Sequence, residues 1–309
     1  MSLSDDLPLV SVVIPTRNRP EIVCRAVRSA LSQTYSKIET VVVVDGPDLT
    51  TVEALQALAE PRLRVISLAE NVGGSEARNI GVREAKGEWI ALLDDDDEWL
   101  PEKLDRQIAL AKADSTGASI VVVCPSIYRR PRKADIIWPK KLPGLEPFSE
   151  HMFDYCSGFQ TSTFVCPREY FLRNPFRGDL KGHQDWDWLL RASGDRDVSL
   201  RIVPTPLSIF NGSEGGSVSH NFGWRLSLAW GRQNRDRMTR MAYSRFIAYH
   251  CARLAAGQGA KTRSFFPLLF ECCFHGRPSV QAVCMFLGVY MVSPKTRRAI
   301  RDLVLRTGN

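Results

Sequence analysis

Four consecutive carboxylates, Asp94 to Asp97, follow the apolar run Trp89 to Leu93. This run is too short for a helix and is typical of a strand buried on both faces of a parallel sheet. Side chains alternate along an extended segment, so Asp94 and Asp96 are expected to share one side. Crowded carboxylates repel one another unless a cation joins them, and their hard oxygen atoms favour Mg²⁺ or Mn²⁺. The alternative is a solvated acidic turn before a helix that has Pro101 in its first turn.

Two further candidate segments also follow predicted strands. Pro15, Thr16 and Arg17 end the first strand, and Asp45 ends the second. The carboxyl ends of strands in an open α/β sheet meet at one crevice, where a ligand binds. Arg17 could pair with a phosphate there, and Asp45 could accept hydrogen bonds from a base or ribose. Taken singly, a surface loop residue and a simple turn former are the plainer interpretations.

A glycine-rich segment, Asn71 to Gly81, leads into a predicted helix through Gly73 and Gly74. Glycine permits a close approach of the backbone, and a helix N-terminus favours an anion. Arg78 lies about one turn inside this helix, where it could reach a diphosphate. The patterns Gly-x-Gly-x-x-Gly and Gly-x-x-x-x-Gly-Lys-Ser/Thr do not occur at the corresponding places, which argues against dinucleotide and P-loop sites.

An alternation of strands and helices must position these residues. It predicts an α/β fold with a doubly wound, mostly parallel sheet. The expected strands are 9–15, 38–44, 63–68, 89–93 and 119–124, and the expected helices are 20–31, 52–58, 75–85 and 103–113. Beyond them we expect a long loop over 128–147, an extended segment at 158–165, a helix at 185–192, a strand at 200–210, and helices at 224–254 and 264–304.

Charge is unevenly distributed along the 309 residues, whose formal net charge is +7. From Trp224 onward there are fifteen Lys or Arg against three acids, which leaves −5 for the preceding residues. This asymmetry predicts a membrane surface or a polyanion as a partner of the C-terminal region, although solvated helix faces explain it equally well. The segment 278–294 is uncharged but shorter than the ~20 apolar residues of a membrane span. We therefore expect a buried or interfacial helix there.

Eight cysteines without a Cys-x-x-Cys pair favour a reduced protein rather than a disulfide framework or a zinc site. The polar, acidic segment from Met1 to Pro8 does not have the pattern of a signal peptide. We therefore expect a cytoplasmic location, at the inner membrane face if the basic region contacts lipid.

Together these segments resemble family 2 glycosyltransferases with the GT-A fold, from Val10 to about Phe210. Ala-Arg-Asn-x-Gly81, followed by Lys86-Gly-Glu-Trp-Ile-Ala-Leu-Leu and the acidic run, is the most specific part. The resemblance implies a nucleotide-sugar donor, with a UDP-sugar expected, and Mg²⁺ or Mn²⁺ as cofactor. It also implies that Asp96 ligates the metal. The implied donor-site residues are Pro15, Thr16, Arg17, Asp45, Gly74, Arg78, Asp94 and Asp95.

A second match is His183-Gln-Asp-Trp-Asp-Trp-Leu-Leu-Arg191, in which the resemblance makes Asp185 the catalytic base. A sugar hydroxyl is a poor nucleophile, and a positioned carboxylate can accept its proton. Family members commonly have Glu where this chain has Gln184. The alternative is that Asp185 caps the helix. The resemblance further places Gln160, Thr161 and Trp186 near the acceptor or sugar, and it makes His220 a metal ligand, although a lone His is more often structural.

We therefore predict an inverting, metal-dependent glycosyltransferase. Residues 1–223 form the catalytic domain, with a nucleotide-binding half (about 8–125) and an acceptor-binding half (126–223), and residues 224–309 form a basic helical appendage. The expected acceptor is a saccharide or a lipid-linked saccharide of surface polysaccharide or glycolipid synthesis, and no nucleic-acid partner is expected. The alternatives are a sugar-nucleotide nucleotidyltransferase and a non-catalytic module that binds nucleotide sugars.

Overall fold

The computed structural model describes residues 7–131, 133–155, 157–212, 223–292 and 296. The chain divides into two compact units. The first comprises Met1–Leu142 and Phe159–Ser217, and the second comprises Pro143–Gly158 and Val218–Asn309. The segment Pro143–Gly158 thus belongs with the C-terminal helices rather than with the catalytic domain, where the sequence placed it. Its helix α5 (Phe148–Met152) is held there by hydrogen bonds, because Glu150 accepts from Thr239 Oγ1 at 2.7 Å and from Arg245 Nη1 at 2.7 Å.

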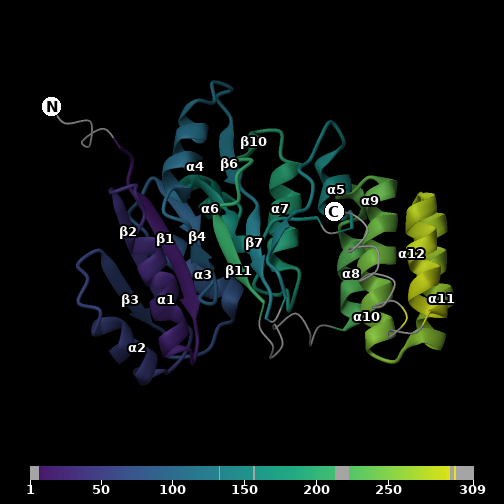
Figure 1. The fold of residues 1–309 in the computed structure, drawn as a ribbon, viewed down its shortest axis with the longest axis horizontal. Coiled ribbons are helices and arrows are strands. Elements are labelled where there is room, and N and C mark those ends of the chain that lie inside the picture. Colours follow the sequence, from purple (N-terminus) through teal and green to yellow (C-terminus); the bar gives the residue numbers. More distant parts are fainter. Residues whose placement is uncertain (1–6, 132, 156, 213–222, 293–295, 297–309) are drawn as a thin grey trace. The chain divides into compact units, whose positions relative to one another are not determined.

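A seven-stranded sheet forms the centre of the first unit (Figure 1). Its order is β10-β6-β9-β4-β1-β2-β3. Strand β9 is antiparallel to both of its neighbours, and the other neighbouring pairs are parallel. The strands are β1 (Val10–Thr16), β2 (Ile38–Val44), β3 (Leu63–Ser67), β4 (Trp89–Leu92), β6 (Ser119–Val123), β9 (Val165–Pro167) and β10 (Val198–Ile202). The expected α/β class and mostly parallel sheet are confirmed.

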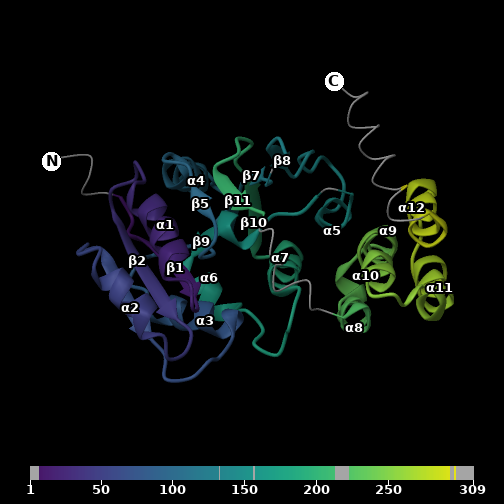
Figure 2. The ribbon, with the colours of Figure 1, turned by 60° about the horizontal axis from the view of Figure 1, so that its bottom comes forward.

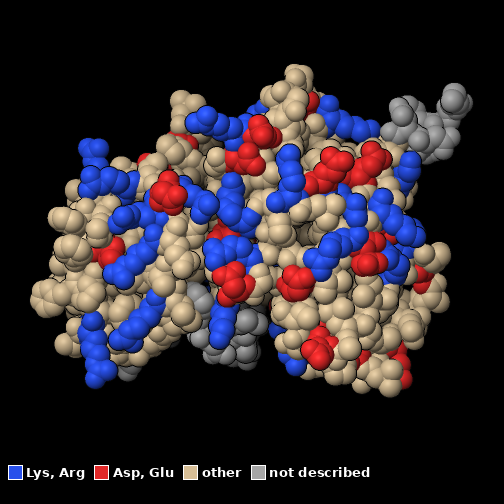
Figure 3. Space-filling view, turned by 180° about the vertical axis from the view of Figure 1, so that it is seen from behind, with Lys and Arg blue, Asp and Glu red and all other residues tan. Residues whose placement is uncertain are grey.

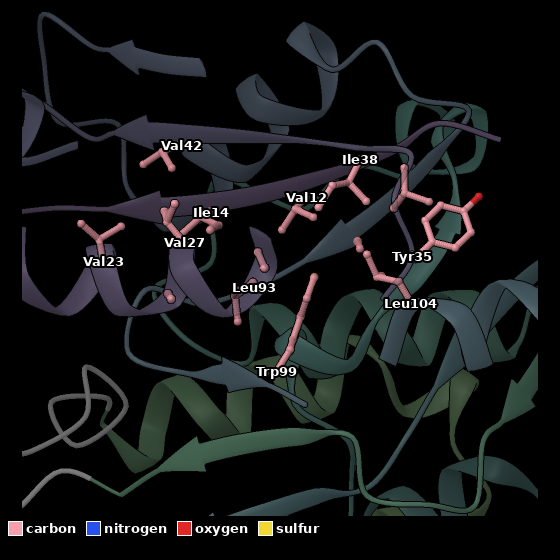
Figure 4. Packing of buried hydrophobic residues seen from close by; sticks show 14 of the residues in the cluster. Val12, Ile14, Val23, Val27, Tyr35, Ile38, Val42, Leu93, Trp99 and Leu104 are labelled. Carbon is pink, nitrogen blue, oxygen red and sulfur yellow. The ribbon is translucent and has the colours of Figure 1, made fainter. Parts of the chain in front are cut away.

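Helices connect the parallel strands: α1 (Pro20–Leu31), α2 (Leu49–Gln56), α3 (Gly74–Glu84) and α4 (Lys103–Lys112). One face of α1 packs on the sheet, since Val23 and Val27 lie against β1 and β2 (Figure 4). Trp99 and Leu104 complete this core from the chain that follows β4 (Figure 4). The continuous apolar runs of β1 and β2 are therefore explained, because helices cover both faces of these strands.

Gly81 shows why the Ala-Arg-Asn-x-Gly segment ends in glycine. A Cβ atom at this position would lie 2.4 Å from Val13 Cγ1 and 3.2 Å from Val43 Cγ2. Helix α3 thus approaches strands β1 and β2 more closely than any side chain at this position would allow. This close packing fixes the N-terminal turn of α3 relative to the ends of the two strands.

A second sheet of four strands, in the order β5-β11-β7-β8, was not expected as such. Its strands are β5 (Glu98–Trp99), β7 (Ser126–Arg129), β8 (Ile136–Trp138) and β11 (Ser208–Asn211). The single strand expected at 200–210 is in fact two, β10 and β11, which belong to different sheets. Pro204 and Pro206 separate them, because neither can donate a ladder hydrogen bond. The segment expected to be extended at 158–165 instead contains a 3₁₀ turn at Thr161–Thr163.

The second unit is helical: α8 (Trp224–Gln233), α9 (Arg240–Arg245), α10 (Ala252–Gly257), α11 (Lys261–Phe270) and α12 (Val280–Met291). The two long helices expected here are interrupted, and π-helical segments follow α9 and α11 at Phe246–Cys251 and Glu271–His275. Within this unit α11 and α12 lie side by side (Figures 1 and 2), and Phe265 contacts Phe286 and Tyr290. Among the described residues, no helix has the length and apolar character needed to span a bilayer.

Candidate active site

The acidic segment after β4 is a turn rather than the extended segment expected from the sequence, because the Asp97 N–H donates to the Asp94 carbonyl at 3.1 Å. Asp95 and Asp97 are 8% and 1% exposed, whereas the side chains of Asp94 and Asp96 are 28% and 42% exposed. Asp94 and Asp96 are therefore the two accessible carboxylates of this turn. The acidic turn considered from the sequence is therefore present, but it is only half solvated, because Asp95 and Asp97 are buried.

Hydrogen bonds from Ser162 and Asn211 hold the acidic segment in place. Ser162 Oγ donates to Asp97 Oδ2 at 2.5 Å and accepts from the Asp94 N–H at 3.1 Å. Asn211 at the end of β11 donates from its backbone N–H to Asp97 Oδ1 at 3.2 Å and from Nδ2 to the Asp96 carbonyl at 2.8 Å. Burial raises the pKa of Asp97 well above its usual range, and Asp94 and Asp96 raise it further. Asp97 thus anchors the segment, and it is not a free ligand.

Two arginines form ion pairs with the other three carboxylates. Arg78 Nη2 lies 2.5 Å from Asp94 Oδ1. Arg19 Nη1 lies between Asp95 Oδ1, at 2.9 Å, and Asp96 Oδ2, at 3.1 Å. Loss of hydration raises the pKa of Asp95 and of Asp96 despite the contact with Arg19. The site therefore holds excess negative charge, which an additional cation would stabilise.

Asp185 lies near this cluster, on α7 (Gln184–Ser193). Arg78 links the two, because its Nη1 donates to Gln184 Oε1 at 3.4 Å while its Nη2 contacts Asp94. Burial raises the pKa of Asp185 to about 6; the Asp94 carboxylate raises it further, whereas the Trp186 N–H and Arg78 oppose this change. Asp185 is the second residue of α7, and His183 occupies the cap position, so Asp185 is not the cap considered from the sequence.

Asp45 holds the glycine-rich segment in place. Its carboxylate accepts hydrogen bonds from Val72 N at 2.7 Å, Gly73 N at 3.0 Å and Asn71 Nδ2 at 2.7 Å. These contacts position the turn that leads into α3, where Gly73 has φ of +85°. The carboxylate predicted to contact a base or ribose is thus already used by three N–H donors. In the structure, Asp45 positions the loop that leads to Gly74 and Arg78.

We expect replacement of Asp45 by Ala to lower the free energy of unfolding by about 2–4 kcal/mol, because the loop would lose its charge-assisted hydrogen bonds. Sugar-nucleotide binding should weaken in parallel, since the turn at Gly73 that leads into α3 would lose its fixed conformation. Urea denaturation and calorimetric titration measure the two effects. Glu53→Ala on α2, where the glutamate is exposed, is the matched control and should leave both quantities unchanged. An Asp45→Ala protein of unchanged stability would contradict this assignment.

The other predicted residues are distributed as follows. Thr16 Oγ1 donates to Asp95 Oδ2 at 2.7 Å, whereas Arg17 is exposed in the loop after β1. Gln160 Oε1 accepts from Ser126 Oγ at 2.8 Å. Trp186 stacks on His183 with ring centroids 4.8 Å apart. Of the remaining three, Pro15 lies in β1, Thr161 is buried in the 3₁₀ turn, and His220 lies outside the described residues.

The chemistry of the donor set fits a hard divalent cation. Asp94 and Asp96 present carboxylate oxygens on the accessible side, and burial of Asp96 disfavours its lone negative charge. No group of three or more Asp, Glu, His or Cys side chains able to hold a metal is found among the described residues. Mg²⁺ is commonly held by one or two carboxylates together with substrate phosphates and water. Two accessible carboxylates are thus compatible with this mode of binding.

Two residues of this site were missed by the sequence reasoning, Arg19 and Asn211, and Ser162, expected with Gln160 and Thr161 near the sugar or acceptor, instead binds Asp97 and Asp94. Arg19 directly precedes the first turn of α1 and follows β1, the strand that pairs with β4. Its place after the strand next to the one that carries the acidic run was the available signal. Nothing in the local sequence marks Asn211, which lies 114 residues beyond Asp97, or the contact of Ser162 with Asp97 across 65 residues. Their role depends on the tertiary fold alone.

Residues 11–178 match the sequence model of Glycosyl transferase family 2. This match covers more than half of the chain, and the chain belongs to that family. It is 41% identical over 118 residues to the succinoglycan biosynthesis protein ExoO of Rhizobium meliloti. The aligned region covers 38% of this chain and 33% of that protein. The chain is 33% identical over 192 residues to the putative colanic acid biosynthesis glycosyl transferase WcaA of Escherichia coli, with 60% and 66% covered. The chain thus matches about a third of the first relative and just under two thirds of the second.

Solved structures share the fold at low identity. The complex of S. aureus TarS residues 1–349 with UDP-GlcNAc superposes with a TM-score of 0.63 at 16% identity, covering 91% of this chain and 81% of that chain. The mannosyltransferase PcManGT of Pyrobaculum calidifontis, in complex with GDP-Man and Mn²⁺, superposes with a TM-score of 0.56 at 19% identity, covering 98% and 81%. These likenesses show a common GT-A architecture.

Proposed function

We propose that this protein transfers a sugar from a nucleotide-sugar donor to an acceptor hydroxyl with inversion at the anomeric carbon. The observation that carries this proposal is the placement of Asp185 beside Arg78 and Asp94, with a pKa of about 6. A carboxylate with this pKa is ionised at neutral pH and still basic enough to accept a proton. Membership of the family gives this geometry its chemical context.

In the proposed reaction the donor lies across the carboxyl ends of β1, β2 and β4. The Asp185 carboxylate accepts the proton of the acceptor hydroxyl as its oxygen attacks the anomeric carbon. The bond from that carbon to the diphosphate oxygen breaks on the opposite face, so a single displacement inverts the configuration. Arg78 stabilises the negative charge that develops on the departing nucleoside diphosphate.

In this proposal Asp96 would hold a divalent cation, with Asp94 beside it. When bound, the ion supplies Lewis-acid stabilisation of the leaving diphosphate. The Mn²⁺ complex of PcManGT supports the use of such an ion within this architecture. Arg19 must then release Asp96 Oδ2, and its guanidinium becomes available to a phosphate oxygen.

The printed names of the relatives suggest the biological setting. Succinoglycan and colanic acid biosynthesis are the processes given for ExoO and WcaA, and we propose that this chain likewise glycosylates a saccharide or lipid-linked saccharide of a surface polysaccharide. A UDP-sugar is the proposed donor, in line with the UDP-GlcNAc complex of TarS. We further propose that the protein acts at the cytoplasmic face of a membrane, contacted through its basic C-terminal region.

A thermal-shift screen tests the donor class. We expect one family of UDP-, GDP- or dTDP-sugars to raise the melting temperature by about 5–10 °C at a hundredfold excess over Kd, and only with Mn²⁺ or Mg²⁺ present. Incubation with that donor and a panel of acceptors should then release nucleoside diphosphate. Release of pyrophosphate from a nucleoside triphosphate would instead indicate a nucleotidyltransferase. Binding without any turnover would indicate the non-catalytic module.

A further inference from the structure

A row of exposed phenylalanines runs along α11 and the π-helical segment that follows it. Phe266, Phe270 and Phe274 are 74%, 53% and 65% exposed. Their spacing of four residues places them on one side of the helix, and the rings of Phe270 and Phe274 stack with centroids 4.8 Å apart. We call these three side chains the phenylalanine row. Large apolar side chains exposed next to one another are unusual on a protein surface and mark a binding surface.

The neighbouring helix continues this apolar surface. On α12, Val280 and Met291 are 81% and 79% exposed, and Cys284 between them is exposed as well. The two helices lie side by side (Figures 1 and 2), with the half-buried Phe265 and the buried Phe286 in contact between them. Each helix therefore has one apolar side that packs within the unit and a second apolar side that does not. A helix of a water-exposed protein ordinarily has only the first.

Basic residues outnumber acidic ones in the helical region that carries the row, with fifteen Lys or Arg against three acids from Trp224 onward. Arg263 and Arg277, both exposed, lie at its two ends. The one acid between residues 237 and 301 is Glu271, against eleven Lys or Arg. Glu271 is 3% exposed and is engaged by Arg232 Nη2 at 2.5 Å and by Tyr243 Oη at 2.6 Å, so it adds no negative charge to this surface. Figure 3 shows the helical unit on the left with scattered basic side chains and few acidic ones.

We propose that the phenylalanine row, flanked by Arg263 and Arg277, is the surface through which this protein binds a membrane of anionic phospholipids. Aromatic rings at the level of the headgroups, with basic residues beside them, are typical of a helix that lies in the interface plane. A protein partner could also bury exposed phenylalanines and arginines, and the excess of basic residues in this region favours an anionic lipid surface. This inference specifies the surface behind the membrane contact of the proposed function.

Sedimentation of the full-length protein with lipid vesicles tests the proposal. Vesicles that contain phosphatidylglycerol should bind the protein, and pure phosphatidylcholine vesicles should bind it at least about tenfold more weakly. The triple variant Phe266→Ser, Phe270→Ser, Phe274→Ser should lose at least about tenfold in affinity. Arg263→Gln and Arg277→Gln should each lose about fivefold, and salt should reduce this difference.

The matched control removes three exposed apolar side chains from the first unit: Leu49→Ser, Ile137→Ser and Leu172→Ser, which are 70%, 53% and 42% exposed. This control should bind vesicles as the parent does, and circular dichroism should show that both triple variants are folded. Equal binding by the phenylalanine variant and the parent would overturn the proposal. So would a concentration-dependent dimer that the phenylalanine variant abolishes without any binding of vesicles. The assay contains no sugar nucleotide, so its failure and a failure of glycosyl transfer are separate outcomes.

Discussion

Replacement of Asp185 by Asn is expected to lower the transfer rate by about 10²–10⁴-fold, because the acceptor hydroxyl loses its proton acceptor. The amide keeps the size of the side chain and its oxygen can still accept from the Trp186 N–H. The loss should therefore appear in the chemical step, with donor affinity unchanged. Rates under saturating donor, together with calorimetric titration of the donor, separate the two quantities.

The same replacement should stabilise the fold at pH 8. The pKa of Asp185 is about 6 in the folded protein, against an ordinary value near 3.8, so folding favours the protonated acid. The stability due to this group is therefore present below about pH 4 and is lost as the pH rises to about 6. Asn has no charge to bury, and we expect a gain of roughly 1–3 kcal/mol at pH 8 that disappears near pH 4. In the parent protein, kcat/KM should rise with pH to a plateau, with an apparent pKa near 6.

Asp187→Asn provides the matched control. This carboxylate is on the same helix, two residues further on, and its Oδ2 lies 2.8 Å from Arg191 Nε. The same chemical change should here lower the free energy of unfolding by about 1.5–3 kcal/mol, because it removes a partner of a buried ion pair. It should also keep the pH dependence of transfer.

Full activity of Asp185→Asn would remove the catalytic base from the proposed mechanism.

The parts of the fold that could be predicted are those whose cause is local. Strands β1, β2 and β4 are short runs rich in apolar residues that are followed by polar ones, and α1 begins at Pro20 with a regular apolar stripe. These patterns follow directly from burial on both faces of a sheet or on one face of a helix. The break before α12 had a local signal as well, Gly276 and Pro278, which the single helix expected over 264–304 did not take into account.

The site shows the same division. The acidic run could be recognised because four carboxylates directly follow a strand. The partners of those carboxylates could not, because Arg19 and Asn211 reach them through the tertiary fold. Asp45 is the most instructive residue. A carboxylate at the end of a strand predicts a ligand contact, but in this protein the N–H groups of the neighbouring loop occupy it. Sequence position gives the neighbourhood of such a residue, and the fold determines its partners.

Replacement of Asp96 by Asn is expected to lower metal-dependent transfer by about 10³-fold, because the departing diphosphate would lose much of its charge neutralisation. Asn211 Nδ2 holds the backbone carbonyl of Asp96, and that bond does not depend on the Asp96 side chain. The acidic segment should therefore keep its conformation in the variant. Electron paramagnetic resonance of free Mn²⁺, measured with and without the donor, gives the metal affinity independently of turnover.

Arg19→Gln should change the Mn²⁺ affinity in the opposite direction to Asp96→Asn. The Arg19 guanidinium lies 2.9 Å from Asp95 and 3.1 Å from Asp96, so it competes with any cation for these oxygens. Its removal should tighten Mn²⁺ binding in the absence of donor by about tenfold, since one positive charge near the site is worth roughly 1–2 kcal/mol at this exposure. Donor affinity should fall at the same time, because Arg19 is then no longer available to the diphosphate. Weaker Mn²⁺ binding by Arg19→Gln would mean that Arg19 organises the carboxylates for the metal instead of competing with it.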